Sequence, residues 1–273
     1  MFDEARLDDE EALERLDSRE TLRALAMAGS QVRRSVRAAA EAGLDRLAEL
    51  RPRGVVVASV GGSAAVGDLF EAVTRHGGTI PVQTCSGGLL PGWVGALDLV
   101  IAVSQSGRAA GALDLVAEAA RRGASVLTVS APDSPLAELS ARARGVHVPI
   151  EVPDASSRTS LWAQAVPVLL AADAMGLATA EPHTMDALAE LLDQRAYESR
   201  PSAEAVVNPA KMLAVEVAES VPIVLGSGPL GGVAARRASA MFGRTGRTPV
   251  AAGALPDAAS QIVACFDGPL AGG

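Results

Sequence analysis

The stretch from Ala96 to Arg122 constrains the fold more than any other part of this chain. It reads as an apolar strand over 98–103, a polar turn (SQSG) at 104–107 and then an amphipathic helix. A helix that begins after such a turn starts with unpaired amide N–H groups, and its dipole is positive at that end. Anions bind readily there, and the two serine hydroxyls can add hydrogen bonds, so the turn is a candidate phosphate site. The alternative is that the serines only cap the helix.

The alternation of strand and helix continues on both sides of this stretch. Apolar strands are expected over 55–60, 79–84, 97–103, 124–130 and 145–150. Strands joined through helices at this spacing form a parallel sheet with right-handed crossovers, and ligands bind at the carboxyl ends of its strands. The turn Gly61-Gly62-Ser63 follows the first strand. Two turns suited to phosphate are therefore expected at one edge of the sheet, which favours ligand binding over helix capping.

The rest of the chain divides into further parts. Residues 1–50 are charged and helical in pattern. Asp17 provides a capping signal for a helix over the following residues, and a second helix is expected over 30–50. Helices are then expected over 159–175, 183–200 and 202–219, and they lead to a further strand, a glycine-rich turn and a further helix. The expected domains are a helical segment (1–50), a first α/β domain (51–155), a helical connector (156–220) and a second α/β domain (221–273) that is incomplete or small.

Composition narrows the class of partner. The formal net charge of −8, with no basic stripe interleaved with aromatic residues, argues against a nucleic-acid partner. The N-terminus is acidic and the apolar runs are short, so neither a signal peptide nor a membrane span is expected. Cys85 and Cys265 lie far apart and in no metal-ligand spacing. We therefore expect a reduced, cytoplasmic chain that uses no metal or other cofactor.

Two motifs support weaker hypotheses. Arg33, Arg34 and Arg37 lie on one expected helix, where they are interpreted as a solvated face balanced by nearby acids. Residues 226–231 (GSGPLG) match the G-x-G-x-x-G pattern of dinucleotide-binding turns. The acidic residue that such a site needs at the end of the next strand is missing, and Pro229 is unusual in that loop. A dinucleotide role is therefore disfavoured.

The two serine turns resemble the signatures of sugar isomerase (SIS) domains. The matching stretches are 55–64 (VVVASVGGSA) and 104–107 (SQSG), and the likeness continues through 208–214 (NPAKMLA) and 223–228 (IVLGSG). Arg158 is similar to the arginine that follows the first domain in bifunctional phosphoglucose/phosphomannose isomerases. The resemblance implies two SIS domains with flavodoxin-like, three-layer parallel sheets, a homodimer and a hexose 6-phosphate ligand. It assigns Arg158 a catalytic role and the phosphate to Gly62, Ser63, Ser104 and Ser106. The turn itself adds Gly107, which lets the backbone come close to the ligand, and Arg108, which can supply charge.

The sequence also departs from the family pattern. Residues 108–111 (RAAG) stand where the family has a threonine and acidic residues, so one phosphate hydroxyl is lost and Arg108 supplies charge in its place. Arg244 stands where the family carries a catalytic glutamate. Residues 258–262 (AASQI) replace the element that holds a catalytic histidine, and a late catalytic lysine would lie beyond Gly273 or is absent.

These departures bear on catalysis, because aldose–ketose isomerisation needs a base with a pKa near neutrality and arginine cannot act as one. His147 is interpreted as a strand residue with a satisfied ring nitrogen. The sequence therefore predicts a sugar-phosphate-binding protein with degenerate or weak isomerase chemistry. The alternative is an active isomerase that interconverts glucose 6-phosphate or mannose 6-phosphate with fructose 6-phosphate, with Glu216 or Glu219 as replacement base. A transcription-regulator role is disfavoured, since the first 50 residues offer no basic recognition helix.

Overall fold

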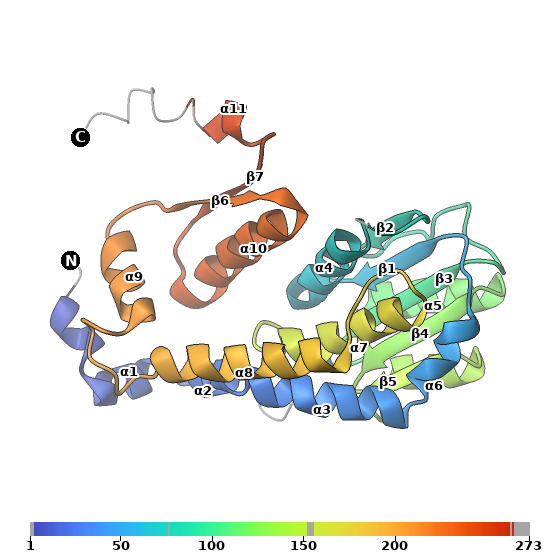
Figure 1. The fold of residues 1–273 in the computed structure, drawn as a ribbon, viewed down its shortest axis with the longest axis horizontal. Coiled ribbons are helices and arrows are strands. Elements are labelled where there is room, and N and C mark those ends of the chain that lie inside the picture. Colours follow the sequence, from blue (N-terminus) through green and yellow to red (C-terminus); the bar gives the residue numbers. More distant parts are fainter. Residues whose placement is uncertain (1–2, 76, 152–155, 263, 265–273) are drawn as a thin grey trace. The chain divides into compact units, whose positions relative to one another are not determined.

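The computed structural model describes residues 3–75, 77–151, 156–262 and 264 of the chain (Figure 1). His76 and Cys265 lie outside the described residues. The chain forms two compact units. The large unit is Glu14–Arg200, and the small unit combines Met1–Leu13 with Pro201–Gly273. The first thirteen residues therefore belong with the C-terminal part of the chain.

The large unit is built on a five-stranded parallel sheet in the order β2-β1-β3-β4-β5. Its strands are β1 (Val55–Ser59), β2 (Val82–Cys85), β3 (Leu99–Ser104), β4 (Ser125–Ser130) and β5 (Val146–Pro149). Every residue of β1 and β3 is buried, as expected for parallel strands covered on both faces. This strand order is the flavodoxin-like one, and the predicted α/β class is confirmed.

Helices cover both faces of this sheet. Those of the large unit are α2 (Thr21–Ala26), α3 (Ala28–Glu41), α4 (Ala64–Thr74), α5 (Ala110–Arg121), α6 (Pro135–Arg142), α7 (Leu161–Ala174) and α8 (Pro182–Glu198), with the 3-10 turns η2 (Leu44–Glu49) and η3 (Gly61–Ser63). Helices α5 and α6 pack on one face, whereas α4, α7 and η2 pack on the other. Helix α3 lies against α7 and α8. Helix α1 (Glu10–Leu16) spans the boundary between the units.

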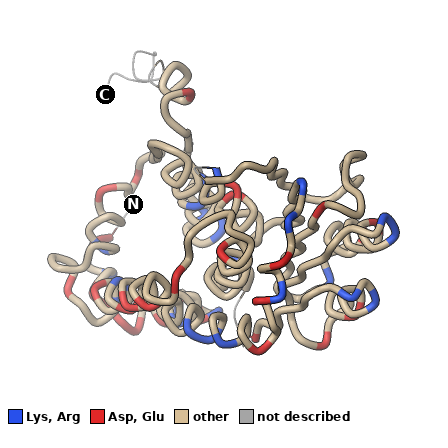
Figure 2. The backbone as a smooth tube through the Cα atoms, turned by 45° about the vertical axis from the view of Figure 1, so that its right-hand side comes forward, with Lys and Arg blue, Asp and Glu red and all other residues tan. Residues whose placement is uncertain are grey.

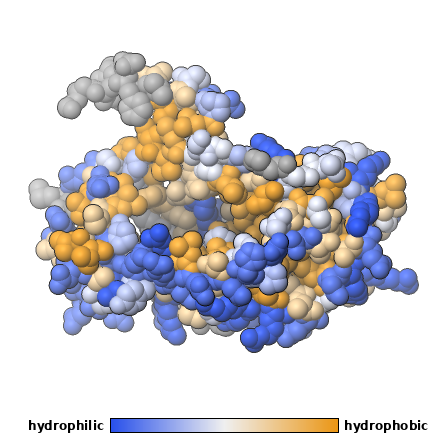
Figure 3. Space-filling view, in the orientation of Figure 1, coloured by the Kyte–Doolittle hydropathy of each residue, from blue (hydrophilic) through white to orange (hydrophobic). Residues whose placement is uncertain are grey.

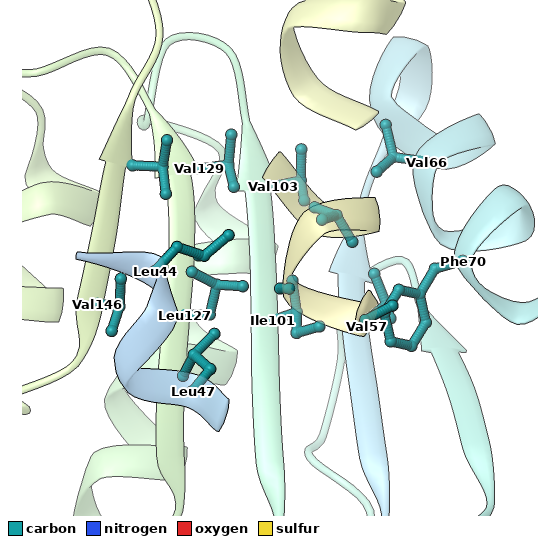
Figure 4. Close-up of a cluster of buried hydrophobic side chains, with 14 of the residues drawn as sticks. Leu44, Leu47, Val57, Val66, Phe70, Ile101, Val103, Leu127, Val129 and Val146 are labelled. Atoms are coloured by element: carbon teal, nitrogen blue, oxygen red, sulfur yellow. The ribbon is translucent and has the colours of Figure 1, made fainter. Parts of the chain in front are cut away.

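Aliphatic side chains fill the core beneath α4 and α7. Val57, Ile101 and Leu127 point from neighbouring strands to the same face of the sheet (Figure 4). Phe70 of α4 is fully buried against them and is the one aromatic residue of this cluster. The core is therefore built from small branched side chains, in keeping with the 3% aromatic content of the sequence.

Polar contacts join α3 to α7 where α7 contains a proline. Pro167 has no N–H, so the Ala163 carbonyl one turn earlier lacks its usual helical partner. The Ser35 hydroxyl of α3 donates to this carbonyl at 3.2 Å. The Ala163 N–H lies in the first turn of α7 and donates to Gln31 Oε1 at 3.3 Å. Two buried side chains of α3 thus pair backbone groups that α7 leaves open.

Two predicted helices are shorter than expected. The helix expected over 30–50 ends at Glu41, because Gly43 takes the left-handed conformation (φ +69°) that ends helices, and a 3-10 turn follows. The helix expected over 202–219 begins only at Pro209. The Asn208 side chain accepts hydrogen bonds from the amides of Ala210 (3.0 Å) and Lys211 (3.2 Å), which sets that start.

The small unit holds a two-stranded parallel sheet of β6 (Ile223–Ser227) and β7 (Ala251–Leu255). Its helical elements are η1 (Glu4–Leu7), α9 (Pro209–Val217), α10 (Gly228–Met241), the π-helical turn η4 (Phe242–Gly246) and α11 (Ala259–Ile262). Lys211, the chain's single lysine, is 8% exposed in its side chain and donates to Asp8 Oδ1 at 2.9 Å. It also donates to the Pro201 and Ala203 carbonyls, both at 2.7 Å, so it ties the N-terminal residues to this unit.

Charge and hydropathy of the described chain are those of an ordinary mixed surface. Lys and Arg positions are interspersed with Asp and Glu positions (Figure 2). None of the helices in the described ranges combines the length and the apolar character needed to cross a membrane.

Candidate functional site

The predicted turns lie at one place on the carboxyl edge of the large sheet. Strands β1 and β3 are parallel neighbours, paired from Val55 with Leu99 to Ser59 with Val103. The chain continues from β1 to β2 on one side and from β3 to β4 on the other, so the strand order reverses between them. Such a switch point leaves a crevice between the two turns, and this is where ligands bind in open parallel sheets.

A cavity of about 760 Å³ occupies this edge. Three of the predicted residues, Ser63, Ser104 and Ser106, line it together. The other lining residues are Val60, Gln105, Ala109, Ala131, Pro132, Ile150, Glu151 and Ser157. The volume falls within the range of small-molecule sites.

The two serines of the second turn do not cap the helix that follows. Helix α5 begins at Ala110, and its N-cap residue, Ala109, makes no side-chain cap hydrogen bond. The Ser106 hydroxyl accepts from the Arg108 amide at 3.3 Å. Ser104 is 5% exposed, and its hydroxyl has no hydrogen-bond partner among the residues that the structure describes. The helix-capping alternative is therefore wrong, and Ser104 presents an unused donor at the cavity.

Gly107 is required by the shape of this turn. Its φ is +64°, a conformation that side chains other than glycine rarely adopt. A Cβ atom at this position would also overlap the side chain of Ser134. The Gly107 carbonyl accepts from the Leu136 amide at 3.2 Å. The tight turn thus holds Ser104 and Ser106 in place against the loop before α6.

A buried polar network lies beneath the cavity. Gln164 of α7 is fully buried, and its Nε2 donates to the Ser160 carbonyl at 3.2 Å and to Ser160 Oγ at 2.8 Å. A carbonyl can only accept, so this contact fixes the orientation of the Gln164 amide. The Ser63 hydroxyl then donates to Gln164 Oε1 in a short hydrogen bond. Ser160 Oγ lies 3.1 Å from Gln105 Oε1, which links the network to the second turn.

This network decides what Ser63 can offer a ligand. A serine hydroxyl has one proton, and that of Ser63 is used in the bond to Gln164. While the bond is kept, Ser63 Oγ presents only lone pairs to the cavity. It can accept a hydrogen bond from a sugar hydroxyl, but it cannot donate one to a phosphate oxygen.

The other predicted residues lie around the cavity without lining it. Gly62 packs closely against Ser157, and Arg158, half-buried and with an interaction partner of its own, follows Ser157 directly. Arg108 is exposed beyond the second turn. Glu151 lines the cavity and was not predicted. Its position directly after the expected strand 145–150 is the signal that would have identified it, because that strand ends at the same edge.

The glycine-rich turn of the small unit has a different basis. A Cβ atom at Gly226 would overlap the carbonyl of Gly231, and one at Gly232 would lie 3.0 Å from Ala254 Cβ. Within the motif, a Cβ atom at Gly231 would lie 3.1 Å from the carbonyl carbon of Gly226, and Gly228 takes the left-handed conformation (φ +71°). The glycines thus serve the close packing of α10 on β6 and β7. Burial lowers the pKa of Arg237, and the nearby charge of Arg244, in η4, lowers that pKa further. Glu216 and Glu219 are exposed residues of the same unit.

His147 lies on β5, where its Nδ1 is 2.8 Å from Thr128 Oγ1. Its Nε2 is buried and, among the described residues, has no hydrogen-bond partner. The prediction of a strand residue with a satisfied ring nitrogen is confirmed, and that nitrogen is Nδ1. Burial lowers the pKa of the imidazole, because a charged ring would lose its hydration there.

The described residues include no group of three or more His, Cys, Asp or Glu side chains that could hold a metal ion.

Comparison with known proteins agrees with this architecture. Residues 206–272 match the family "Bacterial phospho-glucose isomerase C-terminal SIS domain". The comparison with curated proteins returned no match.

Three solved structures illustrate the likeness in fold. A candidate phosphosugar isomerase from Silicibacter pomeroyi is 20% identical, with a TM-score of 0.65 over 86% of this chain and 71% of the other. One from Bacillus subtilis is also 20% identical, with a TM-score of 0.58 over 90% and 72%. The C-terminal domain of glucosamine-fructose-6-phosphate aminotransferase from Francisella tularensis is 15% identical, with a TM-score of 0.58 over 90% and 72%.

Proposed function

Because this chain is a SIS-domain protein related to phosphoglucose isomerases, we propose that it binds a hexose 6-phosphate in the cavity at the carboxyl edge of the large sheet. One observation carries the proposal. Ser104 is 5% exposed as a residue, its hydroxyl has no partner among the described residues, and it lies in a tight turn at the start of a twelve-residue helix. A hydroxyl donor beside open helix amides suits a phosphate group.

The sugar ring would lie between the phosphate turn and the far side of the cavity. The phosphate contacts Ser104 and Ser106 at the start of α5, with the charge of Arg108 nearby. Ser63 accepts from a ring or chain hydroxyl, because its own proton is held by Gln164. Gly62 and Gly107 give the backbone shapes of the two turns, and Arg158 keeps the catalytic role that the family resemblance implies.

Replacing Ser104 and Ser106 together with alanine tests the binding site. We expect glucose 6-phosphate to raise the melting temperature of the natural protein, and the double variant to lose roughly 1–3 kcal/mol of binding free energy. Ser227→Ala is the matched control, since Ser227 ends β6 at the corresponding turn of the small unit. An unchanged affinity in the double variant would overturn the proposed site.

We propose that the isomerase chemistry is degenerate or weak. The family's glutamate and histidine positions hold Arg244 and residues 258–262 here, and neither supplies a base with a pKa near neutrality. A coupled assay that converts fructose 6-phosphate to glucose 6-phosphate and mannose 6-phosphate should give a rate at least ~10²-fold below that of a competent enzyme. A turnover of ~1–10³ per second would contradict this.

One observation favours the alternative of an active isomerase. The Glu151 carboxylate lines the cavity, and a carboxylate can take a proton from carbon beside a carbonyl. If turnover is found, Glu151→Gln should abolish most of it while binding is kept. Glu216→Gln and Glu219→Gln serve as controls from the small unit.

Oligomeric state and cellular location follow from the resemblance and the composition. We propose that the protein is a homodimer that works in the cytoplasm, as the family resemblance and the cysteine usage imply. Light scattering at micromolar concentration should give twice the mass of one chain, which is 27.7 kDa. A monomer would contradict the proposal.

A further inference from the structure

A second cavity, of about 240 Å³, adjoins the first one in the large unit. It is enclosed by α3, the end of β5 and the start of α7. Ile150 and Glu151 line both cavities, so the two meet at this short segment. A ligand held in the serine turns has the second cavity beside it. The charged residues that line this second cavity are Arg34, Arg37, Glu41 and Glu151.

The three arginines of α3 have separate roles. Arg33 points away to α8, where its Nη1 contacts Asp193 Oδ2 at 2.7 Å. Arg34 and Arg37 are three residues apart, so they share a helix face, and both line the second cavity. Neither forms an ion pair or a side-chain hydrogen bond with any residue in the described ranges. The interpretation of this group as a face balanced by acids therefore holds for Arg33 only.

The polar groups around these arginines are already used. Gln31 is buried, donates to the Thr159 carbonyl just before α7 and accepts from the Ala163 amide. Ser35 is buried and donates to the Ala163 carbonyl. Glu41 and Glu151 line the cavity without pairing with either guanidinium. Two unused guanidinium groups thus line a cavity that shares Ile150 and Glu151 with the proposed sugar site. A guanidinium can bind a carboxylate or a phosphate with two parallel hydrogen bonds.

We infer that the cavity lined by Arg34 and Arg37 is a second anion subsite, so that the preferred ligand is a phosphosugar with a second acidic group. This inference rests on the proposed function, because the first phosphate lies in the serine turns. The second group, a carboxylate or another phosphate, binds the two guanidiniums. Sugar hydroxyls donate to the Glu151 carboxylate at the boundary between the subsites, so that carboxylate does not oppose the ligand.

Calorimetric titration with three probes tests this assignment. Glucose 6-phosphate carries one acidic group, 6-phosphogluconate adds a carboxylate and fructose 1,6-bisphosphate adds a phosphate. We expect the natural protein to bind at least one of the two latter probes about 10-fold or more tightly than glucose 6-phosphate, as charge-assisted hydrogen bonds predict. The probe that gains most identifies the second group.

Replacing Arg34 and Arg37 together with glutamine should remove that preference and change the glucose 6-phosphate affinity less than about 2-fold. Arg33→Gln is the matched control and should leave the preference intact, because Arg33 is paired with Asp193. All three positions are exposed, so unchanged melting temperatures are expected to confirm folding.

The outcomes separate this inference from the proposed function. If glucose 6-phosphate binds but the natural protein shows no preference for a second acidic group, the subsite is refuted and the proposed function stands. A preference that survives in the double glutamine variant refutes it as well. If none of the three probes binds, both the proposed function and the subsite are overturned.

Discussion

The two sheets of this protein use the same local pattern, a strand followed by a glycine-rich turn and a helix, with different results. In the large unit, β1 and β3 are fully buried and polar groups under their turns are held by Gln164. In the small unit, Gly226 is the one buried residue of β6, and Leu225 is 38% exposed. Figure 3 shows that hydrophobic residues also lie at the molecular surface.

A turn needs more than glycines before it can bind a ligand. The glycines of the small unit are explained by the packing of α10 on its strands. The turns of the large unit add hydroxyl groups, and a covered sheet with a buried network keeps them in place. The strand–turn–helix sequence pattern is the same in both units. The turns of the large unit are suited to a ligand because the residues that support them are buried.

The largest expected effect compares the two cores. Phe70→Ala should cost ~3–5 kcal/mol of unfolding free energy, because it leaves a cavity under a covered sheet. Leu225→Ala, at a partly exposed position of β6, should cost less than about 1 kcal/mol, since little apolar surface is lost from the interior. Urea unfolding followed by circular dichroism measures both. Equal losses of unfolding free energy in the two variants would contradict the difference in burial between the two units.

The next effect compares two fully buried amide side chains. Gln164→Leu should cost ~2–4 kcal/mol, because the Ser63 hydroxyl and the Ser160 carbonyl both lose partners, and it should also weaken glucose 6-phosphate binding. Asn208→Ala in the small unit removes a helix cap at a cost of ~1 kcal/mol. Its ligand affinity should not change. A similar loss of affinity in both variants would remove Gln164 from the site.

A third test concerns two serines that donate to backbone carbonyls. Ser35→Ala should cost ~1–3 kcal/mol, because the buried Ala163 carbonyl is left without a partner. In a Pro167→Ala background the cost should shrink, since the new helical N–H can pair with that carbonyl. Ser239→Ala, which removes a 2.7 Å bond to the Val250 carbonyl in the small unit, should have a smaller effect at its half-buried position. Equal costs for Ser35→Ala in the two backgrounds would contradict this explanation.

The smallest effect is a dependence of stability on pH. The pKa of His147 is lowered in the folded protein from 6.5, so below about pH 6.5 the unfolded chain takes up a proton that the folded protein does not. Stability should therefore fall as the pH drops from about 6.5 towards the folded pKa. His147→Leu should flatten this slope. His183→Gln, at an exposed position, is the control, and an unchanged slope in His147→Leu would refute the assignment.

Much of this arrangement could be predicted from sequence, because it depends on local patterns. Strands β1 and β3 of the large sheet are short apolar runs, and the turns that follow them contain the glycines and serines that mark them. Gln164 and Ser160 could not be predicted, because they reach the two turns from α7 and its N-cap, 101 and 55 residues away in sequence from Ser63 and Gln105. Helix ends were misjudged where one residue decides, as at Gly43 and Asn208.

The central claim is that a sugar phosphate binds at the turns of the large sheet and not at the glycine-rich turn of the small one. Amide hydrogen exchange of the full chain, measured with and without glucose 6-phosphate, tests this most directly. We predict slower exchange at residues 61–66 and 104–112, with residues 226–232 unchanged. Slower exchange at 226–232, with none at the two serine turns, would contradict the account.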